Sequence, residues 1–477
     1  MNKIIFSLVL ICGSLLFTSC EDDLVVGSVN QSSYNNIGKL EASLKDKNSG
    51  LSDNIIELRT KECITSVCVN LTKAPMKGVD FAISYDAEYL NEYNTQHGTN
   101  FKLFPQNLIS LDGASEANIL MAPDEKQSLA VNLTIQPAST DLEEGTTYVL
   151  PLKITTTTEG ISLSSTSHCI YLIKNYHNEA DCDKGADAVK NFLYFEVNDT
   201  NPLNALEFIR EDGKLFFDYV VLFAANINWN AETGRVYVYN NPNVQFLLDN
   251  NEQYLQPLRK RGIKVLLGVL GNHDEAGVCQ LSDMGCKEFA RELAAICNAY
   301  NLDGVNFDDE YSNYPNLDNP WLTYKSSEAG AKLLYETKKA MPDKYVTVYY
   351  FGSLESNCPS VYGITPNNFV DIVVADYAQS TRPMTGMTQK QCAGMSVELR
   401  RGYGDTSEDY ARSVKEDGYG FYMWFALDPS LYASQVYRIQ NVSRGLYNQE
   451  VKYPTFYYKK NDTTQYLSLI HISEPTR

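Results

Sequence analysis

The sequence has little positive charge, and no stretch of it concentrates Lys and Arg. Its 477 residues contain 40 Lys and Arg against 59 Asp and Glu, which gives a formal net charge of −19 at pH 7. Proteins that bind nucleic acid cluster Lys and Arg to neutralise phosphates. We therefore expect no nucleic-acid partner, and a ligand that is neutral or carries negative charge only at a distance.

Histidine and cysteine are too few and too scattered to indicate a metal site. The chain has five His and 11 Cys, and the cysteine spacing fits neither a zinc pattern nor a dense disulfide framework. Two pairs, Cys63 with Cys68 and Cys279 with Cys286, are close enough in sequence to form disulfides, and the sequence leaves this open. We expect no metal and no cofactor.

The first 19 residues carry two apolar runs, and no other stretch of the sequence is long and apolar enough to cross a bilayer. One early lysine precedes the runs Ile4–Leu10 and Leu15–Phe17, which is typical of a secretory signal and too short for a membrane span. The tetrapeptide that ends at Cys20 resembles a bacterial lipoprotein processing site, and the acids directly after it resemble the surface-export signal of gut Bacteroidetes lipoproteins. We expect a lipid anchor at Cys20 on the outer membrane, at the cell surface. Cleavage followed by release is the alternative.

The remaining chain predicts two domains. Residues 467–477 resemble a translated sequencing-library adapter and are excluded from the fold. The rest is still too long for one ordinary core. Residues 24–176 are rich in Thr, Ser and Asn and contain alternating runs such as Leu129–Ile135, which predict antiparallel strands and a β-sandwich. The polar residues 177–187 predict a linker.

Residues 188–455 alternate apolar runs with helical patterns, which is typical of parallel β/α architecture. Cys286–Tyr300 has apolar residues at helical spacing and predicts the helix before the fourth strand. The apolar runs predict the eight strands of one (β/α)8 TIM barrel: Asn191–Val197, Tyr219–Ala225, Lys264–Leu270, Asp303–Asp309, Tyr345–Phe351, Val370–Tyr377, Met395–Leu399 and Gly420–Ala426.

The fourth predicted strand ends in a cluster of acids. Because side chains alternate along a strand, Asn306, Asp308 and Glu310 share one face. Charged side chains at the carboxyl end of a barrel strand lie where such barrels carry out catalysis. Asp303, at the other end, predicts a cap or an ion pair, and Asp309, which faces away from Asp308, predicts a structural salt bridge.

The run Asp303–Glu310 resembles the signature of glycoside hydrolase family 18, with Asn306 where the family usually has Asp. Residues 223–228, 270–277 and 308–311 further resemble the endo-β-N-acetylglucosaminidases of the endoglycosidase H and F type, and the resemblance covers roughly residues 185–450. Residues 87–94 and the following Phe104-Pro105 resemble a domain of unknown function that precedes such barrels in Bacteroidetes. That domain could serve as a spacer or capture glycans.

The resemblance implies hydrolysis of the β-1,4 bond between the two N-acetylglucosamines of N-glycan cores. Glu310 would be the general acid and then the base. Asp308 is too near Glu310 along one strand for carboxylates that flank a sugar from opposite sides. The resemblance instead implies that the substrate's 2-acetamido group is the nucleophile, that Asp308 orients it, and that the β configuration is retained.

The resemblance also implies two aromatic site residues, and the position of a third at the strand exit makes it a candidate. Tyr377 would hydrogen-bond the acetamido oxygen, Trp424 would lie beneath the reacting sugar, and Tyr311 would face the cleft or pack at the strand exit. Three further residues in loops after strands two and three are expected to contact the glycan: Asn226, Asn272 and His273. We expect Asn306 to donate a hydrogen bond to Asp308 and hold it ionised.

The partners expected from this interpretation are N-linked glycans and glycoproteins, which a monomer would bind. Two other functions stay open. One is an endo-chitinase, which the resemblance of the loops disfavours. The other is a family 18 glycan-binding protein with weak or lost catalysis, which the presence of Asp308 and Glu310 disfavours and Asn306 leaves open.

Overall fold

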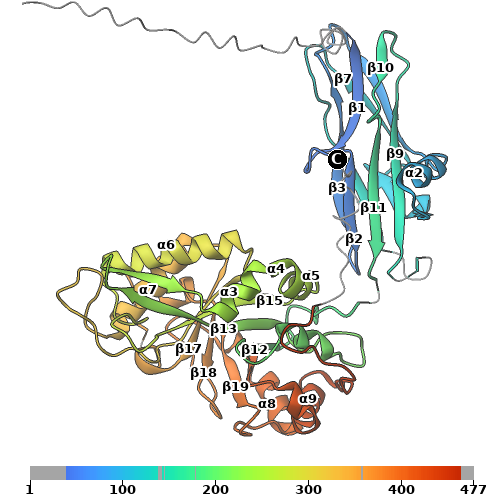
Figure 1. Cartoon of the computed structure of the whole chain (residues 1–477). Coiled ribbons are helices and arrows are strands. Elements are labelled where there is room, and N and C mark those ends of the chain that lie inside the picture. The colour runs from blue at the N-terminus through green and yellow to red at the C-terminus, as the bar shows by residue number, and fades with distance from the viewer. Residues whose placement is uncertain (1–38, 138–141, 144, 178, 356–357, 464–477) are drawn as a thin grey trace, which may run out of the picture. The chain divides into compact units, whose positions relative to one another are not determined.

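The computed structural model describes residues 39–137, 142–143, 145–177, 179–355 and 358–463. The chain divides into two compact units, Met1–His177 and Asn178–Arg477 (Figure 1). Cys20, the predicted signal and the adapter-like residues 467–477 lie outside the described residues. Within the described part of the chain, no helix combines the length and apolar character that a membrane span requires.

The first unit is built from two sheets whose buried side chains form one core. One sheet has the order β10-β1-β3-β8-β6, and the other has the order β2-β11-β9-β4-β7 with β5 paired to β9. The predicted alternation is present in β8, where Val131, Leu133 and Ile135 are buried. The elements are β1 (Leu40–Asp46), β2 (Asp53–Leu58), β3 (Cys63–Leu71), β4 (Val79–Tyr85), α2 (Tyr89–His97), β5 (Lys102–Leu103), η2 (Gln106–Leu108), β6 (Ile109–Leu111), β7 (Glu116–Met121), β8 (Val131–Ile135), β9 (Thr147–Thr155), β10 (Ile161–Leu163) and β11 (His168–Asn175).

The second unit contains a barrel-like sheet. Its strands are parallel in the order β18-β17-β16-β15-β13-β12-β20-β19, and β14 pairs antiparallel with β13. A parallel bridge between Val373 and Cys392 brings the two ends of this order together. Each of the eight predicted strands overlaps an observed one. The strands are β12 (Lys190–Glu196), β13 (Tyr219–Asn230), β14 (Arg235–Tyr239), β15 (Lys264–Leu270), β16 (Gly304–Phe307), β17 (Tyr345–Tyr350), β18 (Ile372–Ala375), β19 (Ala393–Glu398) and β20 (Phe421–Phe425).

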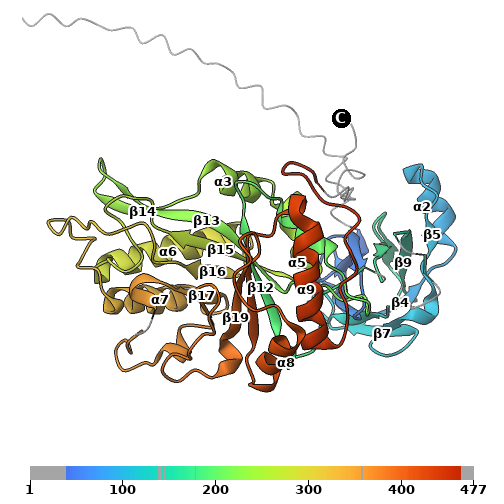
Figure 2. The ribbon, with the colours of Figure 1, turned by 90° about the horizontal axis from the view of Figure 1, so that it is seen from below.

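Helices cover the outside of this sheet, with α6 beside α7 and α8 beside α9 (Figures 1 and 2). The helix before β16 begins three residues earlier than predicted, because the Ser282 hydroxyl accepts a hydrogen bond from the Gly285 backbone N–H and caps it. The helices are α3 (Pro242–Asp249), α4 (Asn251–Tyr254), α5 (Gln256–Lys260), α6 (Asp283–Ala299), α7 (Ser327–Ala340), α8 (Glu408–Glu416) and α9 (Tyr432–Tyr447). The short 3-10 helices are η3 (Pro202–Glu207), η4 (Gly352–Leu354), η5 (Pro366–Asn368), η6 (Gln389–Gln391) and η7 (Pro429–Leu431).

The sheet separates two apolar clusters. In β12, Leu193 and Phe195 belong to the large cluster that contains the helices, whereas Phe192 and Tyr194 belong to a smaller one. The smaller cluster is therefore the interior of the sheet, since successive side chains of a strand point to opposite faces. It lies beneath the acids that follow β16.

Residues 179–187 do not form a linker as predicted. Ala180 and Cys182 are 6% and 9% exposed and pack in the core of the second unit. Asp181 forms an ion pair with Lys214 at 2.8 Å. Residues 179–187 are thus part of this unit, and their polar composition reflects ion pairs and turns at its surface.

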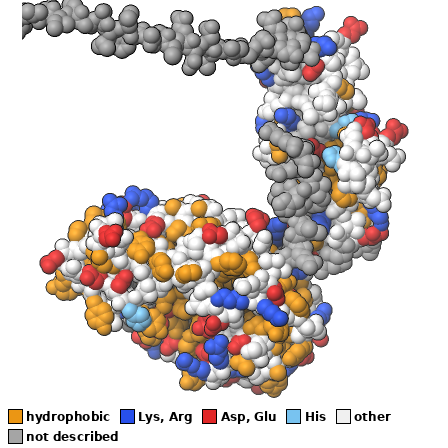
Figure 3. All heavy atoms as spheres, viewed as in Figure 1, with side chains coloured by type: hydrophobic (Ala, Val, Ile, Leu, Met, Phe, Trp, Pro, Cys, Tyr) orange, Lys and Arg blue, Asp and Glu red, His pale blue; other side chains and the backbone are white. Residues whose placement is uncertain are grey.

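Charges of both signs are scattered over the face of the molecule that Figure 3 shows. On the face that Figure 3 shows, Lys and Arg side chains lie among acidic and apolar ones, without a broad basic area. This distribution agrees with the absence of basic clusters in the sequence.

Candidate active site

Asp308 and Glu310 follow β16 and line one pocket of about 410 Å³. The Asp308 backbone N–H donates to the Val269 carbonyl at 3.0 Å, so the chain continues the strand register as far as this acid. Asp308 is 3% exposed and Glu310 is half-buried. The rest of the lining is Tyr194, Glu196, Phe223, Tyr311, Tyr349, Phe351, Asp376, Tyr377, Arg401, Met423 and Phe425.

The loop after β15 holds the backbone of the second acid. The Gly271 N–H donates to the Glu310 carbonyl at 3.0 Å, and the His273 N–H donates to the Tyr311 carbonyl at 2.7 Å. A Cβ at position 271 would lie 1.8 Å from the Ser312 Oγ and 2.5 Å from the Glu310 carbonyl oxygen. Only glycine permits this close approach, so the Gly271-Asn272-His273 segment serves to position Glu310.

Burial and like charge shift both acids toward their protonated forms. Burial raises the pKa of Asp308 well above its ordinary value, and the charges of Glu310, Asp309 and Asp376 raise it further. Burial also raises the pKa of Glu310, as does the charge of Asp376, while a hydrogen bond with Tyr311 opposes the shift. A carboxyl group with a raised pKa can carry a proton near neutral pH, as a general acid must.

Asn306 does not interact with Asp308 as predicted. Asn306 is fully buried, and its Nδ2 donates to the Thr347 Oγ1 at 2.8 Å. These two residues are direct register partners on β16 and β17, so Thr347 is the nearer acceptor. The predicted bond to Asp308, and with it the expectation that Asp308 is held ionised, was wrong.

Asp376, which the sequence analysis missed, connects two of the aromatic residues. It follows β18, and its Oδ1 accepts hydrogen bonds from the Tyr349 hydroxyl and, at 2.7 Å, from the Tyr377 backbone N–H. The Tyr377 ring lies 6.4 Å from that of Tyr349 and 5.6 Å from that of Phe425. The structure therefore brings Tyr377 into the pocket with the acids. An acid at the carboxyl end of the sixth predicted strand, directly before Tyr377, was the signal that could have found Asp376.

Trp424 does not lie in the pocket. It is 0% exposed, its Nε1 donates to the Asn191 Oδ1 at 2.9 Å, and it packs in the cluster that contains the helices. Met423 and Phe425, the residues before and after it, line the pocket instead. The prediction that Trp424 lies beneath a sugar was wrong, because strand alternation points its side chain outward.

The predicted loop residues divide into two groups. Tyr311 is 51% exposed, lines the pocket, and has its ring 4.9 Å from that of His273. Asn226, Asn272 and His273 do not line the pocket. The Asn226 Nδ2 donates to the Gly271 carbonyl at 3.1 Å, so Asn226 supports the loop that holds Glu310.

The two other acids of the motif have the predicted structural roles. Asp303 pairs with Arg259 at 2.8 Å and accepts a bond from the Val265 N–H at 2.9 Å. Asp309 pairs with Lys325 at 3.2 Å.

Among the described residues, no three His, Cys, Asp or Glu side chains are grouped as a metal site would need. All four cysteines of the two open disulfide pairs are free: Cys63, Cys68, Cys279 and Cys286.

Comparison with known proteins gives relatives over both units. A protein-family model whose description reads "-like, N-terminal domain" matches residues 36–161. The crystal structure of Bacteroides thetaiotamicron EndoBT-3987 with Man5GlcNAc product is similar with a TM-score of 0.59 and 46% identity, and the match covers 89% of this chain and 99% of that one. The same enzyme in complex with Man9GlcNAc2Asn substrate matches with a TM-score of 0.59 and 45% identity, over the same shares of the two chains.

Two curated enzymes each match a little more than half of the sequence. Endo-beta-N-acetylglucosaminidase of Flavobacterium sp. (strain SK1022) is 31% identical over 269 residues, which are 55% of this chain and 82% of that protein. Endo-beta-N-acetylglucosaminidase F1 of Elizabethkingia meningoseptica is 42% identical over 280 residues, which are 57% of this chain and 82% of that protein. Identity at this level over most of the relative, together with the paired acids in the pocket, places the chain in the endo-β-N-acetylglucosaminidase family of glycoside hydrolases.

Proposed function

We propose that this protein hydrolyses the β-1,4 bond in the N,N'-diacetylchitobiose core of N-glycans. The observation that carries the proposal is the pocket in which Asp308 and Glu310 meet Tyr377 and Asp376. The relatives named above support it, since one is crystallised with a Man5GlcNAc product and with a Man9GlcNAc2Asn substrate.

Glu310 is the proton donor in this proposal. Its raised pKa keeps a proton available for the glycosidic oxygen, and its half-exposed position lets a sugar approach. Once the bond is broken, the ionised Glu310 takes a proton from the incoming water. Tyr311, on the same side of the pocket, interacts with the Glu310 carboxyl group.

The nucleophile in this proposal is the acetamido oxygen of the substrate. Asp308 and Glu310 belong to one strand exit and so lie on one side of a bound sugar, which does not suit attack from the opposite side. Asp308 would accept a hydrogen bond from the acetamido N–H, and Tyr377 would donate one to its oxygen. The positive charge that develops on the oxazolinium favours the ionised form of Asp308, which stabilises the intermediate.

Substrate assistance can be tested with a thiazoline analogue of the core glycan. We expect the analogue to inhibit competitively, because it copies the cyclic intermediate, and we expect chelators to have no effect. The pocket also holds Glu196 and Asp376 from other strands. A glycosyl adduct on either carboxylate, found by mass spectrometry, would contradict attack by the acetamido group.

We also infer the detailed fold of each unit and the place of the protein in the cell. The strand order and the bridge between β18 and the residue before β19 support a closed (β/α)8 barrel, and the shared core of the first unit supports a β-sandwich. The sequence around Cys20 supports a lipid anchor at the cell surface. A monomeric enzyme is part of the same proposal.

The experiment that separates the candidate functions uses purified protein with N-glycoproteins and, in parallel, with chitin oligomers. We expect glycoproteins to lose all of each glycan except one N-acetylglucosamine, with little cleavage of chitin oligomers. Preferred cleavage of the oligomers would favour an endo-chitinase. Binding of glycans without any cleavage would favour the glycan-binding alternative.

A further inference from the structure

Lys325 has no part in the reaction proposed above, yet its side chain contacts the segment that carries Glu310. It lies two residues before α7, and its side chain is 25% exposed. The backbone on both sides of it is fixed to the loop after β15. The Thr323 N–H donates to the Gln280 carbonyl at 3.0 Å. The N–H of residue 326 donates to the carbonyl of residue 279 at 2.9 Å, so the lysine side chain starts from a fixed backbone.

The Lys325 ammonium group contacts three oxygen atoms within five consecutive residues. It forms an ion pair with the Asp309 Oδ2 at 3.2 Å. It also donates to the Ser312 carbonyl at 3.2 Å and to the Asn313 Oδ1 at 3.1 Å. An ammonium group carries three N–H donors, which matches the number of these acceptors. Residues 309–313 are thus closed into a turn around one charge.

This turn carries two residues of the reaction pocket, Glu310 and Tyr311. Tyr311 has a φ of 59°, which lies in the left-handed region that a residue with a Cβ adopts at a cost. Such a conformation persists only where the surrounding structure holds it. The loop after β15 bonds to the backbone of Glu310 and Tyr311, and Lys325 joins the residues before and after them.

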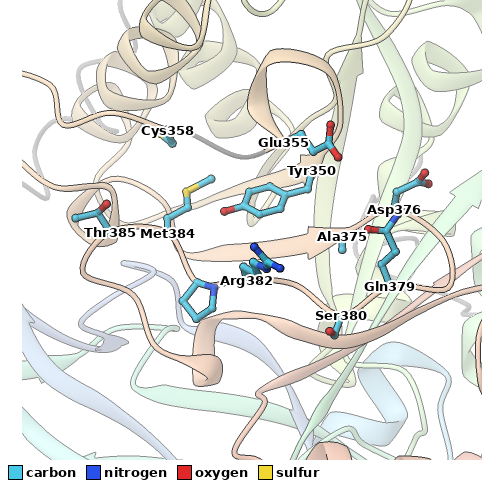
Figure 4. Close-up of a pocket in the computed structure, with 11 residues that line it drawn as sticks. Tyr350, Glu355, Cys358, Ala375, Asp376, Gln379, Ser380, Arg382, Met384 and Thr385 are labelled. Atoms are coloured by element: carbon cyan, nitrogen blue, oxygen red, sulfur yellow. The ribbon is translucent and has the colours of Figure 1, made fainter.

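The first residue of the turn is held at a second point. Asp309 is 2% exposed, and its Oδ2 accepts a hydrogen bond from the Ser353 N–H of η4 at 2.7 Å. Figure 4 shows this part of the chain beside a pocket, with Tyr350 at the end of β17 and Glu355 directly after η4. The ion pair with Lys325 therefore connects the later residues of the turn to a buried, fixed carboxylate.

Another lysine makes the same kinds of contact far from the acids. Lys338 of α7 pairs with Asp371 at 3.0 Å, donates to the Lys344 carbonyl at 2.8 Å, and has a side chain that is 20% exposed. Its two partners lie just before β18 and β17, at the amino ends of these strands, whereas Asp308 follows the carboxyl end of β16. Lys338 therefore serves as a matched control for a lysine that only supports the fold.

We propose that Lys325 is a positioning residue of the reaction, which closes the turn 309–313 and so keeps the Glu310 carboxyl group aimed at the glycosidic oxygen. The proposal rests on the proposed function, because it assigns a role in the same reaction. Lys325 acts through the backbone of the turn and not through contact with the substrate. Its loss should therefore lower kcat and leave glycan binding nearly unchanged.

The test uses one N-glycopeptide and three variants. Lys325→Met keeps the apolar stem and removes the charge and the donors, and Lys338→Met is the control. The double variant Lys325→Met with Asp309→Asn leaves no buried carboxylate unpaired, so it carries the test if Lys325→Met does not fold. For each protein we measure kcat and the melting temperature. The dissociation constant of the glycopeptide is measured with Glu310→Gln added, which prevents turnover.

We expect Lys325→Met and the double variant to lose about tenfold to 100-fold in kcat, as for a reacting group displaced by up to about 1 Å. Their dissociation constants should stay within about twofold of wild type. Lys338→Met should lower the melting temperature about as much as Lys325→Met does, while its kcat stays within about twofold of wild type.

Four results would overturn the positioning role. They are a kcat of Lys325→Met within about twofold of wild type, an equal loss of kcat in Lys338→Met, a loss that appears in the dissociation constant instead of kcat, and full recovery of kcat in the double variant. The last result would mean that Lys325 only balances the charge of Asp309. A wild type that leaves the glycopeptide uncleaved would instead refute the proposed function, and this inference with it.

Discussion

Glu310 and Asp376 stand in one pocket, and their charges interact. Burial raises the pKa of Glu310, and the negative charge of Asp376 raises it further. The general acid must be protonated, so activity is lost as pH rises through this pKa. Asp376 thereby extends the working range of the enzyme toward higher pH.

Replacing Asp376 by Asn tests this coupling. Asp376→Asn keeps the acceptor for Tyr349 and Tyr377 but removes the charge, so the pKa of Glu310 should fall. The basic limb of a kcat/KM against pH profile should move to lower pH. Asp199→Asn, an exposed acid outside the pocket, serves as the control and should leave the limb in place. An unmoved limb in Asp376→Asn would mean that Asp376 does not set the pKa of Glu310.

We expect the buried Asp308 carboxyl group to destabilise the folded protein at neutral pH. The ordinary pKa of Asp308 is 3.8 and burial raises it in the folded protein, so the folded state keeps this proton at pH values where the unfolded chain has lost it. The free energy of unfolding therefore falls as pH rises from 3.8 toward the folded pKa. Asp308→Asn should melt at a higher temperature than wild type at neutral pH, with the difference vanishing near about pH 4, while activity is lost.

A control of opposite sign is available in Asp212. Burial raises the pKa of Asp212, but hydrogen bonds from Arg210 and Lys214 outweigh burial and leave the pKa lowered. Asp212→Asn should therefore lower the melting temperature at neutral pH. Thermal melts of both variants across pH check the two signs, and a destabilised Asp308→Asn would contradict this account.

At the scale of elements, the loop after β15 and the exit of β16 must fit together closely. Gly271→Ala would force its Cβ against the Glu310 carbonyl and the Ser312 side chain, so one of these segments must shift. Displacing a reacting group by about 1 Å can cost about 100-fold in rate. We expect kcat to fall by about that factor, measured on an N-glycopeptide.

The matched control is Gly78→Ala in the first unit. There the new Cβ would meet its nearest neighbours at 3.5 Å, which is ordinary contact. This variant should keep its full activity. If Gly271→Ala is as active as Gly78→Ala, the loop does not position Glu310.

In strand β20, we expect one residue to matter for stability and its neighbour to matter for activity. Trp424→Phe leaves the buried Asn191 Oδ1 without its donor and opens a small cavity, so the free energy of unfolding should fall by about 1–3 kcal/mol. The value of kcat/KM should stay within about twofold of wild type. Phe425→Ala, which alters the pocket, should lower kcat/KM instead. Denaturant unfolding and kinetics on both variants check this. A raised KM in Trp424→Phe but not in Phe425→Ala would show that Trp424 lies beneath the sugar after all.

The strands themselves were predictable, whereas the direction of each side chain was not. Runs such as Val265–Leu270 have no polar side chain because parallel strands are buried on both faces. The same property hides which residues face inward, since Tyr422, Met423, Trp424 and Phe425 are all large. The direction of Asp308 was readable because strand alternation places it on one face with the polar Asn306 and Glu310, opposite the apolar Val305 and Phe307.

Contacts between strands and at strand exits could not be predicted from the sequence either. The partner of Asn306 is Thr347, 41 positions away, and only the register of β16 with β17 brings them together. Asp376 is a single acid after a strand, and a rim residue in contact with solvent has the same pattern. Its hydrogen bonds with Tyr349 and Tyr377 distinguish it.

At the scale of the whole molecule, the division into two units was predictable from the change of pattern after Tyr176. Threonine-rich alternating strands give way there to apolar runs separated by helices. The reason is that strands of the first unit are buried mainly on one face, whereas the parallel strands of the second unit are buried on both. The boundary was placed less well, since Ala180 and Cys182 are the only apolar positions that tie residues 179–187 to the second core.

The central claim is that Glu310 of this protein donates the proton that cleaves the core of an N-glycan. The direct measurement is the mass of one defined N-glycopeptide after incubation with wild type and with Glu310→Gln, whose side chain keeps its shape but has no proton to transfer. We predict that wild type leaves the peptide with one N-acetylglucosamine, and that the variant is slower by at least about 100-fold while it still binds the glycan. Removal of the whole glycan by wild type, or equal rates for the two proteins, would contradict the account.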